Sequence, residues 1–367
     1  MQAHRTVDYS EVTERMRAIA SATQALAERI ELLFVTNIND GDMRETDGGR
    51  LSNIAQYYNR RQADEIIRSL QDIGITVVPF FDELSFLRAV TGEPPASSRL
   101  RVVFTTAEGG TGSGRRALIP SVCNLLGLPV LNSKAHAQTL SRHKFHVHAV
   151  LQRVGVRVPG TWKFDGGWAA GQAPSVGTRV IVKPMYESQS IGIGDDSIRV
   201  ADVDFEAFLR DRLVRFAQPA VVQEFVSGDE VGVPLARIGD TTYSLPPMAY
   251  RQSDGTLFDH RPKTFDDENV KHNVRHVLLK APGPLAAALD EAAVLAFDAL
   301  EMSGAARIDF RIDVDGRAWV FDTSESPPPM AGSSYASSMA HLGFSVSEML
   351  AVWLGICLEE YGLLSGV

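Results

Sequence analysis

Apolar residues recur along the N-terminal third of the chain with the spacings of alternating helices and strands. Helical spacing covers residues 10–31 and 51–73, and short apolar runs lie at 32–35, 75–81 and 100–106. Helices placed between consecutive strands predict a parallel sheet, because parallel strands need crossover connections. The polar segment at residues 37–50 is long enough to predict a functional loop.

The remainder of the chain predicts helices mixed with short strands. The expected helices are 133–154, 203–216, 285–302 and 346–361, and the expected strands are 179–184, 220–225, 231–236 and 242–245. Residues 246–273 are polar and contain few periodic apolar positions, which is typical of a lid over a site.

A hairpin at residues 306–330 concentrates oxygen-bearing side chains. Residues 307–312 alternate as a half-buried strand, an Asp-Gly turn follows, and residues 317–322 return. This pairing places Asp309 near Asp322, and Ser324 shares the face of Asp322. Hard divalent cations such as Mg²⁺ prefer oxygen ligands. A hairpin that exposes its acids to water is the alternative, and this stretch alone leaves both open.

Lys183 ends the strand at 179–184 and precedes a loop rich in glycine and hydroxyl groups, residues 185–195. An ammonium group beside loop amides and hydroxyls suits a polyphosphate. The alternative is a simple turn with an exposed lysine. Both readings remain open from this segment alone.

Glycines at residues 107–114 stand between a strand and the helix expected at 115–126. Backbone amides in this position bind anions. The next strand, residues 129–132, ends without the acid that a dinucleotide ribose requires. We therefore expect a loop that binds a substrate carboxylate, in preference to a nicotinamide site.

Three histidines surround Lys144, which invites comparison with a metal site. His146 and His148 are two positions apart, so they point to different faces of the expected helix. A zinc site is therefore not expected.

Composition indicates an ordinary globular protein of 367 residues, with about two or three subdomains. No apolar run approaches about 18 residues and no signal peptide is recognised, so no membrane partner is expected. Cys123 and Cys357 are too few for a disulfide framework, which favours a cytoplasmic location. A net charge of −9 argues against a nucleic-acid partner.

The order of these motifs resembles the ATP-grasp enzymes, most closely the D-alanine–D-alanine ligase branch, from about residue 101 onward. The resemblance implies an α/β chain whose ATP-grasp part is α+β. Its expected parts are an N-terminal parallel-sheet subdomain for the first substrate (1–132), a central lid subdomain (133–222) and a C-terminal catalytic subdomain (223–367).

The resemblance also implies roles for individual residues. ATP would be bound by phosphate lysines, a phosphate loop, an adenine hinge, a ribose acid and a lid: Lys144, Lys183, Glu187, Gln189, Ser190, Gln223, Glu224, Phe225, Val226, Glu230, Phe258 and Lys263. Arg307, Lys263 and Ser334 would be catalytic. Mg²⁺, with Mn²⁺ as an alternative, would be held by Asp309, Asp322 and Ser324.

Several positions depart from the family pattern. Asp322 and Ser324 stand where the family has Glu and Asn, and residues 326–330 read Ser-Pro-Pro-Pro-Met in place of Ser-Pro-Gly-Met. Proline cannot donate the backbone N–H that the family's glycine supplies. The Gly-Gly-x-Ser-x-Glu stretch for the first D-alanine is missing, and the phosphate loop has Ser188-Gln189 in place of Gly-Ser.

These features predict a ligase that joins small amino-acid or peptide substrates through an acyl phosphate. The polar segment 37–50, with Asp40, Asp42, Arg44, Glu45 and Asp47, favours a first substrate other than D-alanine. D-alanine–D-alanine ligase itself and a catalytically silent nucleotide-binding protein are the alternatives. The resemblance leaves both a monomer and a homodimer open.

Overall fold

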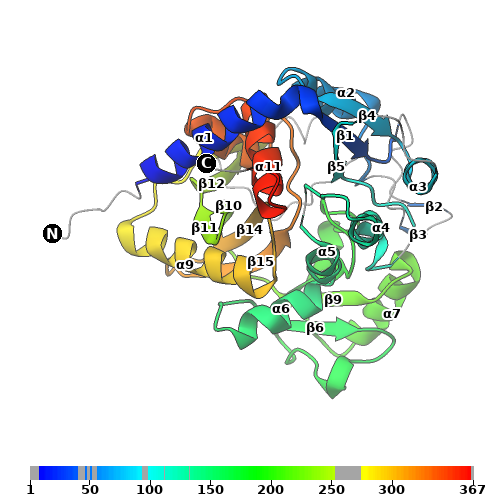
Figure 1. Cartoon of the computed structure of the whole chain (residues 1–367). Coiled ribbons are helices and arrows are strands. Elements are labelled where there is room, and N and C mark those ends of the chain that lie inside the picture. Colours follow the sequence, from blue (N-terminus) through cyan, green and yellow to red (C-terminus); the bar gives the residue numbers. More distant parts are fainter. Residues whose placement is uncertain are drawn as a thin grey trace.

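The computed structural model describes residues 8–39, 46–47, 50–51, 56–92, 98–110, 112–131, 133–252 and 274–364, and the chain forms three main sheets (Figure 1). A short ladder also pairs β2 (Thr46–Asp47) with β3 (Arg50–Leu51). The side chains of 46–47 and 50–51, and the rest of the segment 40–55, lie outside the described residues. The prediction of a polar first-substrate loop at 37–50 therefore falls largely outside them.

The N-terminal sheet is parallel, as predicted. Its order is β4 (Thr76–Phe80), β1 (Ile30–Val35) and β5 (Leu100–Thr105). Helices α1 (Ser10–Leu26), α2 (Arg60–Gln71), α3 (Glu83–Thr91) and α4 (Leu118–Leu126) accompany it. Of the fourth strand expected at 129–132, the described residues 129–131 form a single bridge, Val103 to Val130.

Two of these helices are shorter than the sequence predicts. The chain leaves α1 through a 3-10 turn at Ala27–Arg29, because β1 already begins at Ile30. Helix α2 begins at Arg60 and not at residue 51, because Asn59 and Gln62 form a reciprocal capping box that fixes its start.

The helix predicted at 133–154 is two helices, α5 (Ala135–Arg142) and α6 (Lys144–Arg153). The break lies at His143, whose φ of −96° and ψ of 81° are not helical, and its Nδ1 accepts the His146 N–H at 3.3 Å. The Ser133 hydroxyl instead donates to the carbonyls of Ser303 and Glu325, each at 3.1 Å. Ser133 thus joins the subdomains and does not cap a helix.

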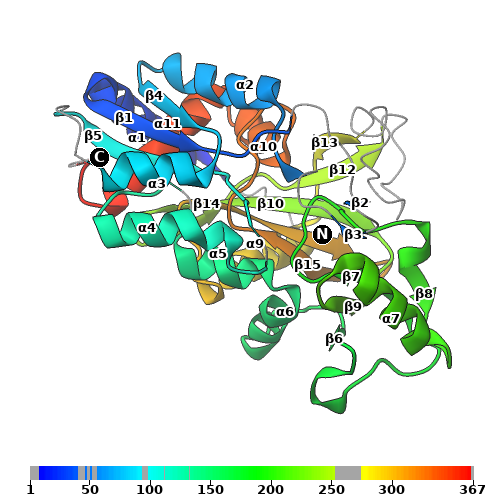
Figure 2. The same cartoon turned by 90° about the vertical axis from the view of Figure 1, so that its right-hand side faces the viewer.

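The central sheet is antiparallel and small. Its order is β6 (Thr161–Phe164), β9 (Ala220–Glu224), β7 (Arg179–Pro184) and β8 (Ile198–Val200). Helix α7 (Phe205–Phe216) buries Phe205, Leu209 and Phe216 against it. Figure 2 shows this green lobe extending away from the other two sheets.

The C-terminal sheet holds the predicted hairpin. Its order is β13 (Val274–Leu278), β12 (Met248–Gln252), β10 (Asp229–Ile238), β14 (Ala305–Ile312) and β15 (Ala318–Ser324), and β11 (Thr241–Ser244) also pairs with β10. Helix α9 (Gly283–Ala299) buries Leu289 and Phe297 against one face of this sheet. Residues 253–273, the bulk of the predicted lid with Phe258 and Lys263, lie outside the described residues.

The C-terminal helices close the molecule onto its N-terminal part. Helix α10 (Ser334–His341) leads into α11 (Val346–Glu360), which packs against α1 (Figure 1). Apolar residues of α11, the N-terminal sheet and α2 share one core. No single helix in the described ranges is long and apolar enough to cross a membrane, although α10 and α11, bent by 99° at their junction, meet those criteria as a pair.

Candidate functional site

A cavity of about 470 Å³ is lined by residues of the central and C-terminal sheets and of the segments around the starts of α2 and α6. Every predicted site residue that the structure describes lines this one cavity: Lys144, Lys183, Glu187, Gln189, Ser190, Gln223, Glu224, Phe225, Val226, Glu230, Arg307, Asp309, Asp322, Ser324 and Ser334. These residues come from segments far apart in the sequence, so their convergence is a property of the fold. The roles assigned to Phe258 and Lys263 stay predictions.

Two lysines face the cavity from the central subdomain. Lys183 ends β7, is 7% exposed, and its Nζ donates to the Gln223 Oε1 at 2.8 Å. Burial lowers the pKa of Lys183 to about 8, an effect that the Asp322 carboxylate only partly offsets. Lys144 begins α6 and donates to the backbone carbonyl of Glu187. Burial lowers the pKa of Lys144 as well.

His148 lies behind the cavity wall, in contact with the lining residue Gln223. Its ring lies 2.9 Å from the Thr161 hydroxyl, 3.3 Å from the Phe321 carbonyl and 3.2 Å from the Gln223 amide nitrogen. Burial, reinforced by the Lys183 ammonium, lowers the pKa of His148 to about 4. His148 is therefore neutral near pH 7. His143 and His146 instead stack on each other, with ring centroids 3.5 Å apart.

The two predicted metal acids are register partners across β14 and β15. Asp309 is opposite Asp322, and the ladder bulges between Asp309 and Phe310. Arg307 donates to both Asp309 oxygens, at 2.6 and 2.8 Å. Burial nevertheless raises the pKa of Asp309, and the negative charge of Asp322 raises it further. Ser324 lies opposite Arg307 and not opposite Asp309.

Glu230 has a cationic partner that the sequence analysis missed. Arg311 donates to its Oε2 at 3.0 Å, and its guanidinium lies 5.5 Å from the centre of the Phe321 ring. The Lys183 ammonium lies 5.3 Å from the same ring. Arg311 was detectable, because it follows Arg307 and Asp309 at the strand period of two.

Ser334 also lines the cavity. Its Oγ accepts from the Tyr250 hydroxyl and from Arg307 Nη1, each at 3.3 Å. The Tyr250 ring meets His276 edge-on at 4.7 Å, and both residues line the cavity. Neither was predicted, because Tyr250 lies within the segment 246–273 that was interpreted as a polar lid, whereas its first part forms strand β12, and no strand was expected at β13.

The proline run also reaches the cavity wall. Pro328 lines it, and the buried Glu325 just upstream accepts from Arg116 Nη1 at 2.9 Å. Proline has no N–H, so the backbone at Pro327, Pro328 and Pro329 offers no donor to a reacting group.

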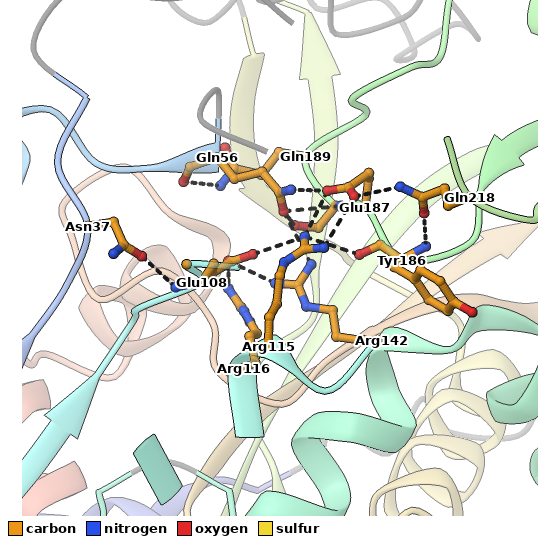
Figure 3. Close-up of polar contacts among 12 residues, drawn as sticks. Asn37, Gln56, Glu108, Arg115, Arg116, Arg142, Tyr186, Glu187, Gln189 and Gln218 are labelled. Atoms are coloured by element: carbon orange, nitrogen blue, oxygen red, sulfur yellow. Dashed lines mark hydrogen bonds and ion pairs between the residues drawn. The ribbon is translucent and has the colours of Figure 1, made fainter. Parts of the chain in front are cut away.

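The glycine loop after β5 binds a carboxylate of the chain itself. The Gly109 N–H donates to Glu83 Oε1 at 2.6 Å, and the Glu108 N–H donates to Asn37 Oδ1 at 2.6 Å. The expectation of a substrate carboxylate at these amides is therefore wrong. The loop instead delivers the buried Glu108 to Arg116, Arg142 and Arg115 (Figure 3).

Comparisons with known proteins point to one family. The family model described as D-ala D-ala ligase C-terminus matches residues 154–354. A D-alanine–D-alanine ligase of Bordetella petrii is 27% identical over 64% of this chain and 70% of its own length.

Two solved structures share the fold. The Bacillus anthracis D-alanine–D-alanine ligase complexed with ATP superposes with a TM-score of 0.66 at 15% identity, covering 90% of this chain and 98% of that one. The VanG D-Ala:D-Ser ligase of Enterococcus faecalis gives 0.63 at 16% identity, covering 89% and 99%.

Proposed function

Because the chain belongs to the D-alanine–D-alanine ligase family of ATP-grasp proteins, we propose that it is an ATP-dependent ligase that joins a carboxylate to an amine. The observation that carries this proposal is the convergence of Lys144, Lys183, the Asp309–Asp322 pair and Arg307 on one cavity. Charges of both signs at this spacing suit a nucleotide triphosphate together with its cation.

The nucleotide would lie between the central and C-terminal sheets. Lys144 and Lys183 would supply positive charge to the phosphates, and residues 223–226 would form hydrogen bonds with the edge of the adenine base. Glu230, held by Arg311, would accept from the ribose hydroxyls. The related Bacillus anthracis structure was solved with ATP bound, which supports this assignment.

The acid pair fits Mg²⁺, with Mn²⁺ as an alternative. Both carboxylates offer hard oxygen ligands, and Asp309 keeps lone pairs beyond those that Arg307 occupies. Burial and the neighbouring Asp322 raise the pKa of Asp309, and a bound cation would favour the ionised form of this carboxyl. Asp309 and Asp322 would hold the ion, and Ser324 would be a weak or water-mediated third ligand. The bound ion would neutralise charge on the transferring phosphate.

The reaction needs no nucleophilic side chain. An oxygen of the substrate carboxylate attacks the γ-phosphorus of ATP, which gives an acyl phosphate and ADP. The amine then attacks the acyl carbon, loses a proton and displaces inorganic phosphate. Positioning and electrostatics carry most of the catalysis in phosphoryl transfer. Arg307, held beside Ser334, would stabilise the tetrahedral intermediate.

We propose a carboxylate donor other than D-alanine, with an amino acid or small peptide as the amine. The proline run supports this, because it removes backbone donors from the wall that the family uses for its intermediate. D-alanine–D-alanine ligase itself is the second candidate, and the Bordetella petrii relative favours it.

The test combines nucleotide binding with product identity. Calorimetry should show ATP binding in the presence of Mg²⁺. ADP release should then be measured across a panel of amino-acid pairs, with product masses. A nucleotide that binds while no pair releases ADP would favour a silent homologue, and no binding at all would exclude the proposal.

A further inference from the structure

The phosphate loop, defined here as residues 185–193, is tied to the N-terminal subdomain by buried polar side chains (Figure 3). The partners come from two separate N-terminal segments: Gln56 precedes α2, and Arg115 precedes α4. Neither residue belongs to the central sheet that carries the loop.

Gln56 contacts three consecutive residues of the loop. Its side-chain oxygen accepts from the Ser188 hydroxyl at 2.6 Å and from the Ser188 N–H at 3.3 Å. Its side-chain nitrogen donates to the Glu187 carboxylate. Its backbone carbonyl accepts from the side-chain nitrogen of Gln189 at 3.3 Å. Gln56 is only 4% exposed, so water does not compete for these contacts.

An amide is the group that this position requires. The Gln56 oxygen faces donors, including Arg142 Nη1 at 3.2 Å, whereas its nitrogen faces a carboxylate. A glutamate of the same shape would keep the accepting half and lose the donating half. The network therefore requires an amide at position 56, and a side chain that matches only its size would not suffice.

Glu187 is the loop's own anchor. Arg115 donates to its two oxygens at 2.8 and 3.2 Å, and Gln218 of the central subdomain donates at 2.8 Å. Burial opposes ionisation, but the Arg115 guanidinium outweighs it and holds the pKa of Glu187 below its ordinary value. The anchor is thus a carboxylate that both subdomains bind.

The loop's backbone needs this external support. Gln189 and Ser190 have φ angles of 54° and 64°, the left-handed region that residues with a Cβ rarely adopt. Such conformations persist where surrounding contacts over-determine them. Within the loop itself, the Ile191 and Ile193 amides donate to the Ser188 and Ser190 carbonyls. The contacts from Gln56 add a constraint from outside the loop, beside those that Arg115, Gln218 and Lys144 make to Glu187.

We propose that Gln56 is a positioning residue that couples the phosphate loop to the first-substrate subdomain. It holds Glu187, Ser188 and Gln189 in the geometry needed to cover a nucleotide, and it acts through these residues without reacting. The consequence for catalysis rests on the proposed function, whereas the anchoring itself is testable without nucleotide.

The test uses hydrogen exchange of the loop amides in the full chain without nucleotide, followed by ATP titration calorimetry. Gln56→Glu sets a second carboxylate against Glu187, so loop exchange should accelerate about tenfold or more and ATP affinity should fall. Adding Glu187→Gln restores a donor facing an acceptor, and the double variant should recover most of the protection. Ser188→Ala gives a milder loss if the first variant fails to fold.

Gln218→Glu is the matched control, because it sets a carboxylate against Glu187 from within the central subdomain. It should leave the Gln56 contacts to Ser188 and Gln189 intact, and therefore perturb the loop less than Gln56→Glu does. Loop exchange within twofold of the unmodified chain in folded Gln56→Glu overturns the proposal. Equal losses in both single variants, without rescue in the double variant, also overturn it. If the unmodified chain binds no ATP, the ligase proposal fails, while loop exchange still decides the anchoring.

Discussion

Asp309 and Asp322 face each other across the β14–β15 ladder, beside the bulge that separates Asp309 from Phe310. A bulge changes the direction in which neighbouring side chains point. Both carboxylates line the cavity, so the hairpin presents them together to a nucleotide. We therefore expect Asp309 and Asp322 to matter more for metal binding than Ser324, the third predicted ligand.

Asp309→Asn should lower the ADP-forming rate about a hundredfold or more, the equivalent of about 3 kcal/mol, because it removes charge from the cation. Ser324→Ala should cost less than about tenfold, since Ser324 lies opposite Arg307. Rates measured across a Mg²⁺ titration compare the two variants. Equal losses would identify Ser324 as a direct and necessary ligand.

ATP affinity should fall as the pH rises through the Lys183 transition. Burial lowers the pKa of free Lys183 to about 8, and bound phosphate would raise it again. The ammonium is therefore already present below about pH 8, whereas above that pH the binding of ATP must take up a proton at Lys183. Calorimetry in buffers of different ionisation enthalpy measures that uptake.

Lys183→Met should abolish this uptake and weaken ATP binding. Lys163→Met is the control, because Lys163 lies on β6 and pairs with Asp165 away from the cavity. An unchanged uptake in Lys183→Met would show that another group titrates.

Glu108→Gln should destabilise the fold by about 3–5 kcal/mol, because it removes the buried carboxylate that Arg115, Arg116 and Arg142 share, although Arg115 and Arg116 keep their pairs with Glu187 and Glu325. Denaturant midpoints measure the loss. Glu206→Gln, at the exposed pair with Arg210, should cost about 0–1 kcal/mol. Comparable shifts in the two variants would contradict a structural role for the buried cluster.

The same carboxylate gives a signature in acid. Burial opposes its ionisation, yet Arg116, Arg142 and Arg115 hold the pKa of Glu108 at about 2, against an ordinary value of 4.5. Its contribution to the free energy of unfolding is full above pH 4.5 and is lost as the pH falls toward 2. Unfolding midpoints of Glu108→Gln should depend less on pH across that window.

D-alanine alone should be a poor substrate. The wall at Pro328 lacks the backbone N–H that the family uses. Apolar pockets discriminate by only about 1–3 kcal/mol per methylene, so selection of D-alanine depends on a close fit. An altered wall should therefore change which carboxylate substrate is preferred. Products of reactions with D-alanine alone and with mixed amino acids should be compared by mass. D-alanyl-D-alanine as the sole product, formed at enzymatic rates, would establish the second candidate function.

The sequence predicted the strands and acids whose signals are local. The strand at Arg179–Pro184 and the hairpin with Asp309 opposite Asp322 follow from apolar alternation and an Asp-Gly turn. The resemblance then supplied the roles of residues such as Lys144 and Glu230, which no local pattern distinguishes.

The rest depends on contacts that no window of sequence contains. In the sequence, Arg115, Arg142 and Glu108 do not differ from ordinary surface charges. Both arginines pair with Glu108 only because the fold brings their segments together. Gln56 was assigned to a helix that in fact begins at Arg60, so its contact with Ser188 was invisible. The break at His143 was missed because apolar periodicity continues across it.

In the proposed reaction the carboxylate is activated as an acyl phosphate. A reactive substrate pair whose carboxylate substrate carries heavy oxygen at both positions distinguishes this route from others. We expect ADP formation, with one heavy oxygen transferred to each inorganic phosphate and the other retained in the amide. Release of AMP, or phosphate that carries no heavy oxygen while amide is formed, would contradict it.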